Sequence, residues 1–126
     1  MAIYESGEMY LETILVLYGK MEKVRAIDIC RELNYSKPSV SVALSNLKKD
    51  NYVTVDASGT VMLTESGRKI AEKIFERHTV VSSLLKSIGV SEKTAAEDAC
   101  KIEHDISDET FEALKKHVEK TRKSME

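Results

Sequence analysis

The sequence lacks long apolar runs and contains little cysteine, proline or glycine. No run of about 18 apolar residues is present, which excludes an ordinary membrane-spanning helix. No basic-then-apolar segment begins the chain, so we expect a cytoplasmic protein without a signal peptide. Two cysteines, Cys30 and Cys100, have no spacing that requires a disulfide. One proline and five glycines among 126 residues predict a mostly helical chain.

Catalytic motifs are missing as well. The sequence contains no glycine-rich phosphate loop and no serine in a nucleophile-elbow pattern, and its three histidines lie far apart. We therefore expect no enzymatic activity, and the sequence favours a binding function.

A helix-turn-helix pattern covers residues 25–49. A first helix is expected over Ala26–Leu33, where Ile27, Cys30 and Leu33 recur every three residues and predict a buried face. Two amphipathic helices joined by a turn also occur in many helical proteins, so the pattern alone leaves a packing role open.

The second helix of this pattern has the composition of a DNA-reading helix. Ser36 is its predicted N-cap, Pro38 lies in its first turn, and it begins at about Lys37. Its inward face is expected to comprise Val40, Ala43, Leu44 and Leu47. Its outer face comprises Lys37, Ser39, Ser41, Val42, Ser45 and Lys48. A face that is slim and free of acidic residues suits the major groove, which is only about 12 Å wide.

Two short strand-forming runs follow this helix. Residues 52–55 and 61–63 are rich in β-branched and apolar side chains, and a glycine-containing turn separates them. A hairpin directly after a recognition helix is the wing of a winged helix. The next helix is capped by Thr64 and spans roughly 22 residues. The predicted fold is therefore mostly α, with an N-terminal winged helix-turn-helix and small hairpin wing followed by an all-helical lobe.

Charge is distributed unevenly along the chain. The net charge is −2, but residues 20–50 carry seven basic and four acidic side chains, whereas residues 91–112 carry two basic and eight acidic ones. The first segment suits an anion such as DNA, and the second suits a cation or a basic partner.

A group of metal-binding residue types lies in the acidic segment. Cys100, Glu103 and His104 follow at i, i+3 and i+4, so a thiol, a carboxylate and an imidazole would share one face of a helix. These donors suit a divalent transition metal better than magnesium or calcium. An ordinary helix with a small cysteine, a solvated glutamate and a helix-end histidine is the alternative interpretation.

These segments together resemble the metal-dependent repressors of the diphtheria-toxin-repressor and manganese-transport-regulator family. The resemblance rests on EMYLETILVLY, SKPSVSVALSNLKKDNYV, LTESGRKIAEKIFERH and AEDACKIEHDISDE. It implies a winged DNA-binding domain over residues 1–72 and a helical dimerisation and metal-binding domain over residues 73–126. The implied partners are a palindromic double-stranded DNA operator and a second copy of the chain, with no membrane.

The resemblance also implies a set of metal ligands. The primary ligands would be Met9, Cys100, Glu103 and His104, and a second site would use Glu12 and His78. Met9 and Cys100 match the iron-responsive branch, whereas Glu12 and His78 match the manganese-responsive branch. The expected cofactor is one or two divalent metal ions per subunit, with Fe(II) preferred and Mn(II) next.

The resemblance places the DNA-binding residues on the outer face and flanks of the recognition helix. They are Arg25, Ser36, Lys37, Pro38, Ser39, Ser41, Val42, Ser45 and Lys48. Val42 stands where the iron-type repressor has a glutamine that reads a base, so a different operator is expected. The dimer contact is expected to use Leu84, Leu85, Ile88 and Phe111.

The function expected from these features is a metal-activated repressor that controls metal-uptake genes. Two alternatives remain. One is a winged-helix regulator that does not depend on metal. The other is a metal-storage or metal-delivery protein in which the helix-turn-helix is only a packing device.

Overall fold

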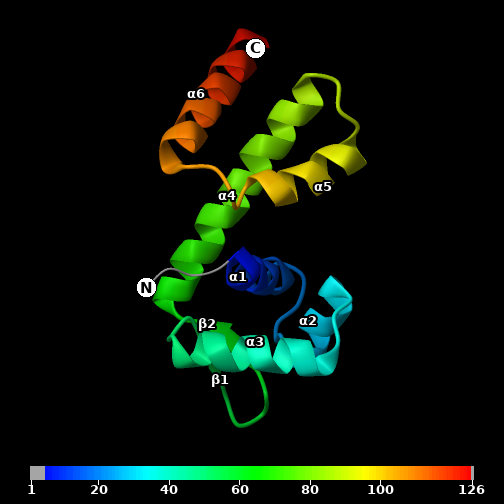
Figure 1. Cartoon of the computed structure of the whole chain (residues 1–126), viewed down its shortest axis with the longest axis vertical. Coiled ribbons are helices and arrows are strands. Elements are labelled where there is room, and N and C mark those ends of the chain that lie inside the picture. The colour runs from blue at the N-terminus through cyan, green and yellow to red at the C-terminus, as the bar shows by residue number, and fades with distance from the viewer. Residues whose placement is uncertain (1–4, 126) are drawn as a thin grey trace. The chain divides into compact units, whose positions relative to one another are not determined.

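The computed structural model describes residues 5–125 and divides into two compact units, 1–73 and 74–126. The elements in chain order are α1 (Glu5–Tyr18), α2 (Ala26–Leu33), α3 (Lys37–Lys49), β1 (Val53–Val55), β2 (Val61–Leu63), α4 (Glu65–Ser87), α5 (Glu92–Ile102) and α6 (Asp108–Met125). Figure 1 shows the three short helices with the hairpin, and the second half of α4 with α5 and α6. The predicted order of helix-turn-helix, hairpin and helical lobe is confirmed, and α1 precedes it.

The first unit is built around an apolar core. Its largest fully buried side chains come from α1, α2, α3, both strands and the segment before α2: Leu11, Ile14, Val24, Ile29, Val40, Val53 and Val61. The inward face predicted for α3 is confirmed, because Val40, Leu44 and Leu47 are buried and Ala43 packs against them. This core fixes α3 on α1 and α2 and leaves its opposite side in solvent.

The buried face of α2 differs from the one predicted. Ile27 is 37% exposed, whereas Ile29 is fully buried beside Cys30. The helix turns every 3.6 residues, so the stripe of Ala26, Ile29, Cys30 and Leu33 follows its pitch better than a strict three-residue repeat does. The prediction that Ile27 is buried was wrong.

Local capping explains where α2 ends and α3 begins. Asn34 takes the left-handed conformation (φ 57°) that commonly ends a helix. The Ser36 side-chain oxygen then accepts a hydrogen bond from the backbone N–H of Ser39 at 3.3 Å, and Pro38 lies in the first turn of α3. The turn of the helix-turn-helix is thus set by three adjacent sequence signals.

The hairpin is antiparallel, with Thr54 paired to Met62. The β2 end of the hairpin also pairs with the residues just before α2. The Val61 N–H donates to the Val24 carbonyl at 2.8 Å, and Arg25 forms an antiparallel β-bridge with Thr60. The start of α4 packs tightly under the hairpin: a Cβ on Gly67 would lie 2.0 Å from the Tyr52 carbonyl oxygen. The wing is therefore held from both sides.

The second unit has few buried apolar side chains and two buried charged ones. The buried residues are Ile74 and Val81 of α4, Ala95 and Ala99 of α5 and Phe111 of α6, together with Arg77 and Glu103. Within residues 5–125, no helix combines the length and the apolar content that crossing a membrane requires.

Candidate metal centre and DNA-reading surface

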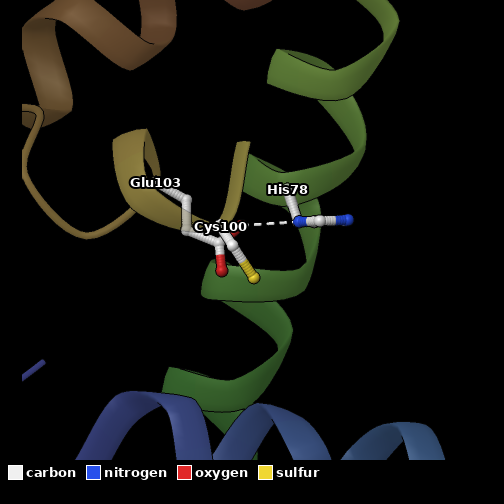
Figure 2. A group of neighbouring side chains, drawn as sticks. All are labelled: His78, Cys100 and Glu103. Atoms are coloured by element: carbon white, nitrogen blue, oxygen red, sulfur yellow. Dashed lines mark hydrogen bonds and ion pairs between the residues drawn. The ribbon is translucent and has the colours of Figure 1, made fainter. Parts of the chain in front are cut away.

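The candidate metal centre lies between α4 and the end of α5. Ligand atoms of His78, Cys100 and Glu103 all lie within 4.8 Å of one another. Figure 2 shows the imidazole coming from α4, and the thiol and the carboxylate coming from the last turn of α5 and the residue after it. Segments some 25 residues apart in sequence thus supply one cluster, which spacing alone had not joined.

Glu103 is the centre of this cluster. Its side chain is fully buried, its Oε2 lies 2.8 Å from His78 Nδ1, and its Oε1 lies 3.4 Å from His104 Nε2. The His104 side chain is itself only 3% exposed. One buried carboxylate therefore faces two imidazoles, one through each oxygen.

The helix ends earlier than the sequence indicated. α5 stops at Ile102, Glu103 is its C-cap, and His104 lies in the turn that follows. Glu103 keeps a helical backbone (φ −58°, ψ −27°), so its side chain remains close to Cys100 as the i, i+3 spacing predicted. The prediction that His104 lies within the helix was wrong, although its imidazole still faces Glu103.

The residues present fit a divalent transition metal. Oε1 of Glu103 accepts no hydrogen bond from the residues that the structure describes, although it is buried. A buried carboxylate oxygen without a hydrogen-bond donor is costly, and a cation would satisfy it. Imidazole and thiolate are donors that suit iron and zinc, and carboxylate also suits manganese. Cys100 is exposed and so open to an incoming ion.

A buried arginine holds the turn that carries Glu103 and His104. Arg77 Nη1 donates to the backbone carbonyls of Glu103 (3.1 Å) and Ile106 (2.8 Å), and Nη2 donates to the Asp108 carboxylate. Its guanidinium also lies 5.3 Å from the ring centre of Phe111. Arg77 therefore fixes the backbone between α5 and α6 and positions the two candidate ligands that this turn carries.

Sequence reasoning missed Arg77. The available signal was its place three residues after Ile74 and four before Val81, on the buried stripe of α4, where a charged residue must have partners. Phe111 had been expected in the dimer contact, but it is 3% exposed within the chain and packs on Arg77. That prediction was wrong for Phe111, whereas Ile88 is 70% exposed.

Met9 and Glu12 lie on α1, in the first unit, and their roles as ligands stay predictions. Met9 is half-buried, and the Tyr35 hydroxyl lies 4.0 Å from its sulfur. His117 and Cys30 lie outside the metal-binding group: His117 is exposed on α6, and Cys30 is buried in the first unit.

The predicted DNA-reading surface is exposed throughout. Every residue of the set lies in solvent: Arg25, Ser36, Lys37, Pro38, Ser39, Ser41, Val42, Ser45 and Lys48. The Arg25 backbone N–H donates to the Asp28 carboxylate at 2.9 Å and so begins α2. Lys48 and Lys49 lie in the last turn of α3, and no acidic residue lies on that helix. The surface is therefore free to meet phosphates and bases.

Comparison with known proteins agrees with both halves of this arrangement. Residues 2–61 match the model of the iron dependent repressor N-terminal DNA binding domain, and residues 64–126 match that of the iron dependent repressor metal binding and dimerisation domain. The matched relatives are transcriptional regulators, a family without enzymatic activity.

Two relatives illustrate the similarity in sequence. An uncharacterised helix-turn-helix transcriptional regulator of Methanocaldococcus jannaschii is 35% identical over 118 residues, covering 92% of this chain and 94% of that protein. The transcriptional regulator MntR of Escherichia coli is 32% identical over 111 residues, covering 88% of this chain and 72% of that protein.

Solved structures give the same result. The manganese regulator SloR aligns with a TM-score of 0.80 at 26% identity over 94% of this chain, and IdeR of T. acidophilum aligns with a TM-score of 0.75 at 28% identity over 93%. This chain spans 55% of the length of each of those two chains. The chain belongs to the diphtheria-toxin-repressor and manganese-transport-regulator family of metal-dependent transcriptional repressors, with a DNA-binding domain, a metal-binding and dimerisation domain and a divalent metal cofactor.

Proposed function

We propose that the protein is a cytoplasmic, homodimeric repressor that binds a palindromic operator when loaded with metal and controls metal-uptake genes. Residues 1–72 would read DNA, and residues 73–126 would dimerise and bind metal. The proposal rests mainly on the buried Glu103 carboxylate, which lies between His78 and His104. Arg77 fixes the turn that carries it.

The proposed primary site uses Cys100, Glu103 and His104 together with Met9 of α1. The proposed second site uses Glu12 and His78. The position of Glu103 supports a shared ligand, because each of its oxygens faces a different imidazole. When bound, the metal supplies a positive charge that satisfies the buried carboxylate.

We propose Fe(II) as the physiological metal and Mn(II) as the second candidate. The Cys100 thiol in the cluster and the thioether of Met9 are soft donors, which favour iron over manganese. The names of two relatives, the manganese regulator SloR and MntR, favour manganese. The two ions must therefore be compared directly.

The proposed mechanism is a shift in population. A ligand set drawn from α1 and from the second unit lets metal select the one arrangement in which the two α3 helices of a dimer meet successive major grooves, about 34–36 Å apart. Metal-free protein samples other separations and binds DNA weakly. The metal must bind the selected state more tightly by several kcal/mol, which a multidentate site can supply.

The test is an anaerobic titration of Fe(II) and Mn(II) into the protein with promoter DNA. We expect DNA affinity to rise steeply with one or both ions and to return to its starting value after chelation. DNA affinity that stays flat across both titrations would contradict the proposal.

Two variants test the alternatives. If Cys100→Ala and His104→Ala leave both DNA affinity and its metal response unchanged, a metal-independent winged-helix regulator is favoured. Tight metal binding without salt-sensitive DNA binding would favour a storage or delivery protein instead.

A further inference from the structure

The outer face of α3 carries one apolar side chain among hydroxyls and cations. Val42 is 62% exposed, the largest value among the large apolar residues described in the first unit. Ser39 and Ser45, three residues before and after it, lie on the same face and are exposed. A single exposed valine is ordinary on a protein surface, but this one stands at the middle of the surface that meets DNA.

The serines at the start of α3 already have partners. The Ser36 hydroxyl donates to Ser39 Oγ at 2.9 Å and accepts from the Ser39 backbone N–H at 3.3 Å. These contacts fix the start of the helix. Val42 lies about one turn further along α3 and takes no part in capping, and its side chain is exposed to solvent.

The major groove offers a valine one kind of partner. Among the base edges exposed there, the thymine C5-methyl is the apolar group, and the other groups are hydrogen-bond donors and acceptors. Because valine is β-branched, it holds essentially one rotamer in a helix and loses little freedom when it makes this contact. Its two methyl groups are thus presented at a fixed position.

We infer that Val42 is a specificity-determining residue that selects thymine over cytosine at one position of each operator half-site by contact with the C5-methyl group. The inference rests on the proposed DNA-binding function. It adds to that function the base that α3 prefers and the side chain responsible.

The test begins with selection of bound duplexes from a random library, using the full-length protein with Mn(II) or Fe(II). Each thymine of the enriched sequence is then replaced in turn by deoxyuridine, which removes the methyl group and preserves base pairing. At one thymine per half-site we expect affinity to fall about fourfold, as for one buried methyl group. Replacing that thymine by cytosine should cost more, and 5-methylcytosine should recover part of the loss.

Two matched variants test whether the thymine preference comes from Val42. In Val42→Ala, thymine and deoxyuridine should bind equally at that position, and circular dichroism should be unchanged because the side chain is exposed. Ile27→Ala, which truncates an exposed apolar residue of α2, should keep the full thymine preference.

The outcomes distinguish failure of the proposed DNA-binding function from failure of the role of Val42. Enrichment of no sequence overturns the proposed function, and this inference with it. An enriched operator on which wild type and Val42→Ala show the same deoxyuridine penalties overturns the role of Val42 alone.

Discussion

The two units of the chain are stabilised by different means. The first unit buries side chains of leucine, isoleucine and valine from all its helices and both strands. The second unit buries fewer large apolar side chains, Ile74, Val81 and Phe111, together with two alanines and the ionisable side chains of Arg77 and Glu103. An apolar core is stable without a ligand, whereas a buried carboxylate is costly until its charge is compensated. We therefore expect metal to add stability mainly by compensating the buried Glu103 carboxylate of the second unit.

The largest expected effect concerns Glu103. Glu103→Gln should weaken metal binding more than a hundredfold, since it removes a charged ligand rather than a supporting neighbour, whose loss typically costs 10- to 100-fold. The metal-free variant should be at least as stable as metal-free wild type, because an amide is cheaper to bury than a carboxylate. Isothermal titration and thermal unfolding with and without Mn(II) measure both effects. A variant that keeps the metal-induced rise in melting temperature would contradict the assignment.

The next effect tests the apolar core of the first unit. Leu11→Ala should lower the free energy of unfolding by about 3–5 kcal/mol, because it removes a fully buried leucine and leaves a cavity. Urea denaturation of the metal-free protein measures the loss. Met62→Ala, at a side chain 53% exposed on the wing, is the control and should change stability by less than about 0.5 kcal/mol.

A smaller effect is expected at Arg77. Arg77→Met should destabilise the second unit by roughly 2–4 kcal/mol, because the buried carbonyl of Glu103 and the half-buried carbonyl of Ile106 lose their donor. The ion pair itself adds little, since the Asp108 side chain is 72% exposed. Arg68→Met, which removes a solvent-exposed pair with Glu72, is the control.

Metal affinity separates the positioning role of Arg77 from general stability. At a temperature where the variant remains folded, Arg77→Met should still bind metal about tenfold more weakly, because the turn that carries Glu103 and His104 is no longer fixed. Unchanged metal affinity would leave Arg77 with a purely structural role.

The smallest effect is expected in the wing. Asp56 accepts hydrogen bonds from the Ser58 hydroxyl (2.7 Å) and from the backbone N–H groups of Ser58 and Thr60 (both 2.9 Å). The Ser58 hydroxyl, followed by the Thr60 N–H, lowers the pKa of this carboxyl below its ordinary value of 3.8. The stabilisation is therefore present above that ordinary pKa and is lost as pH falls through the lower value in the folded protein.

Asp56→Asn removes the charge that these donors stabilise. We expect a slightly lower urea midpoint at pH 6, and a difference from wild type that shrinks as the pH falls below about 3.8. If the urea midpoints of Asp56→Asn and wild type differ by the same amount at pH 6 and below pH 3.8, the charge of Asp56 does not support the wing.

The regular elements could be predicted because their causes are local. Ser36 and Pro38 set the start of α3, and its apolar repeat marked its buried face. The buried face of α2 was assigned wrongly because eight residues give too few turns to distinguish a three-residue repeat from the helical pitch. Local patterns thus give element type more reliably than they give the face of a short helix.

The candidate site was predicted only in part, because several of its contacts join residues far apart in sequence. The spacing of Cys100, Glu103 and His104 indicated a metal-binding turn, but the approach of His78 to Glu103 depends on how α4 packs on α5. Arg77 could not be recognised from its neighbours in sequence, since its partners lie 26 to 31 residues away. Whether Met9 and Glu12 complete the site stays a prediction.

The unequal exposure of the two cysteines has a practical consequence. Cys30 is buried in the apolar core, whereas Cys100 is exposed next to the candidate ligands. A thiol-specific alkylating reagent should therefore label native protein at one position, and a coordinated thiolate should resist it. The rate at which Cys100 is labelled, measured by mass spectrometry, would then report metal occupancy without the need for DNA.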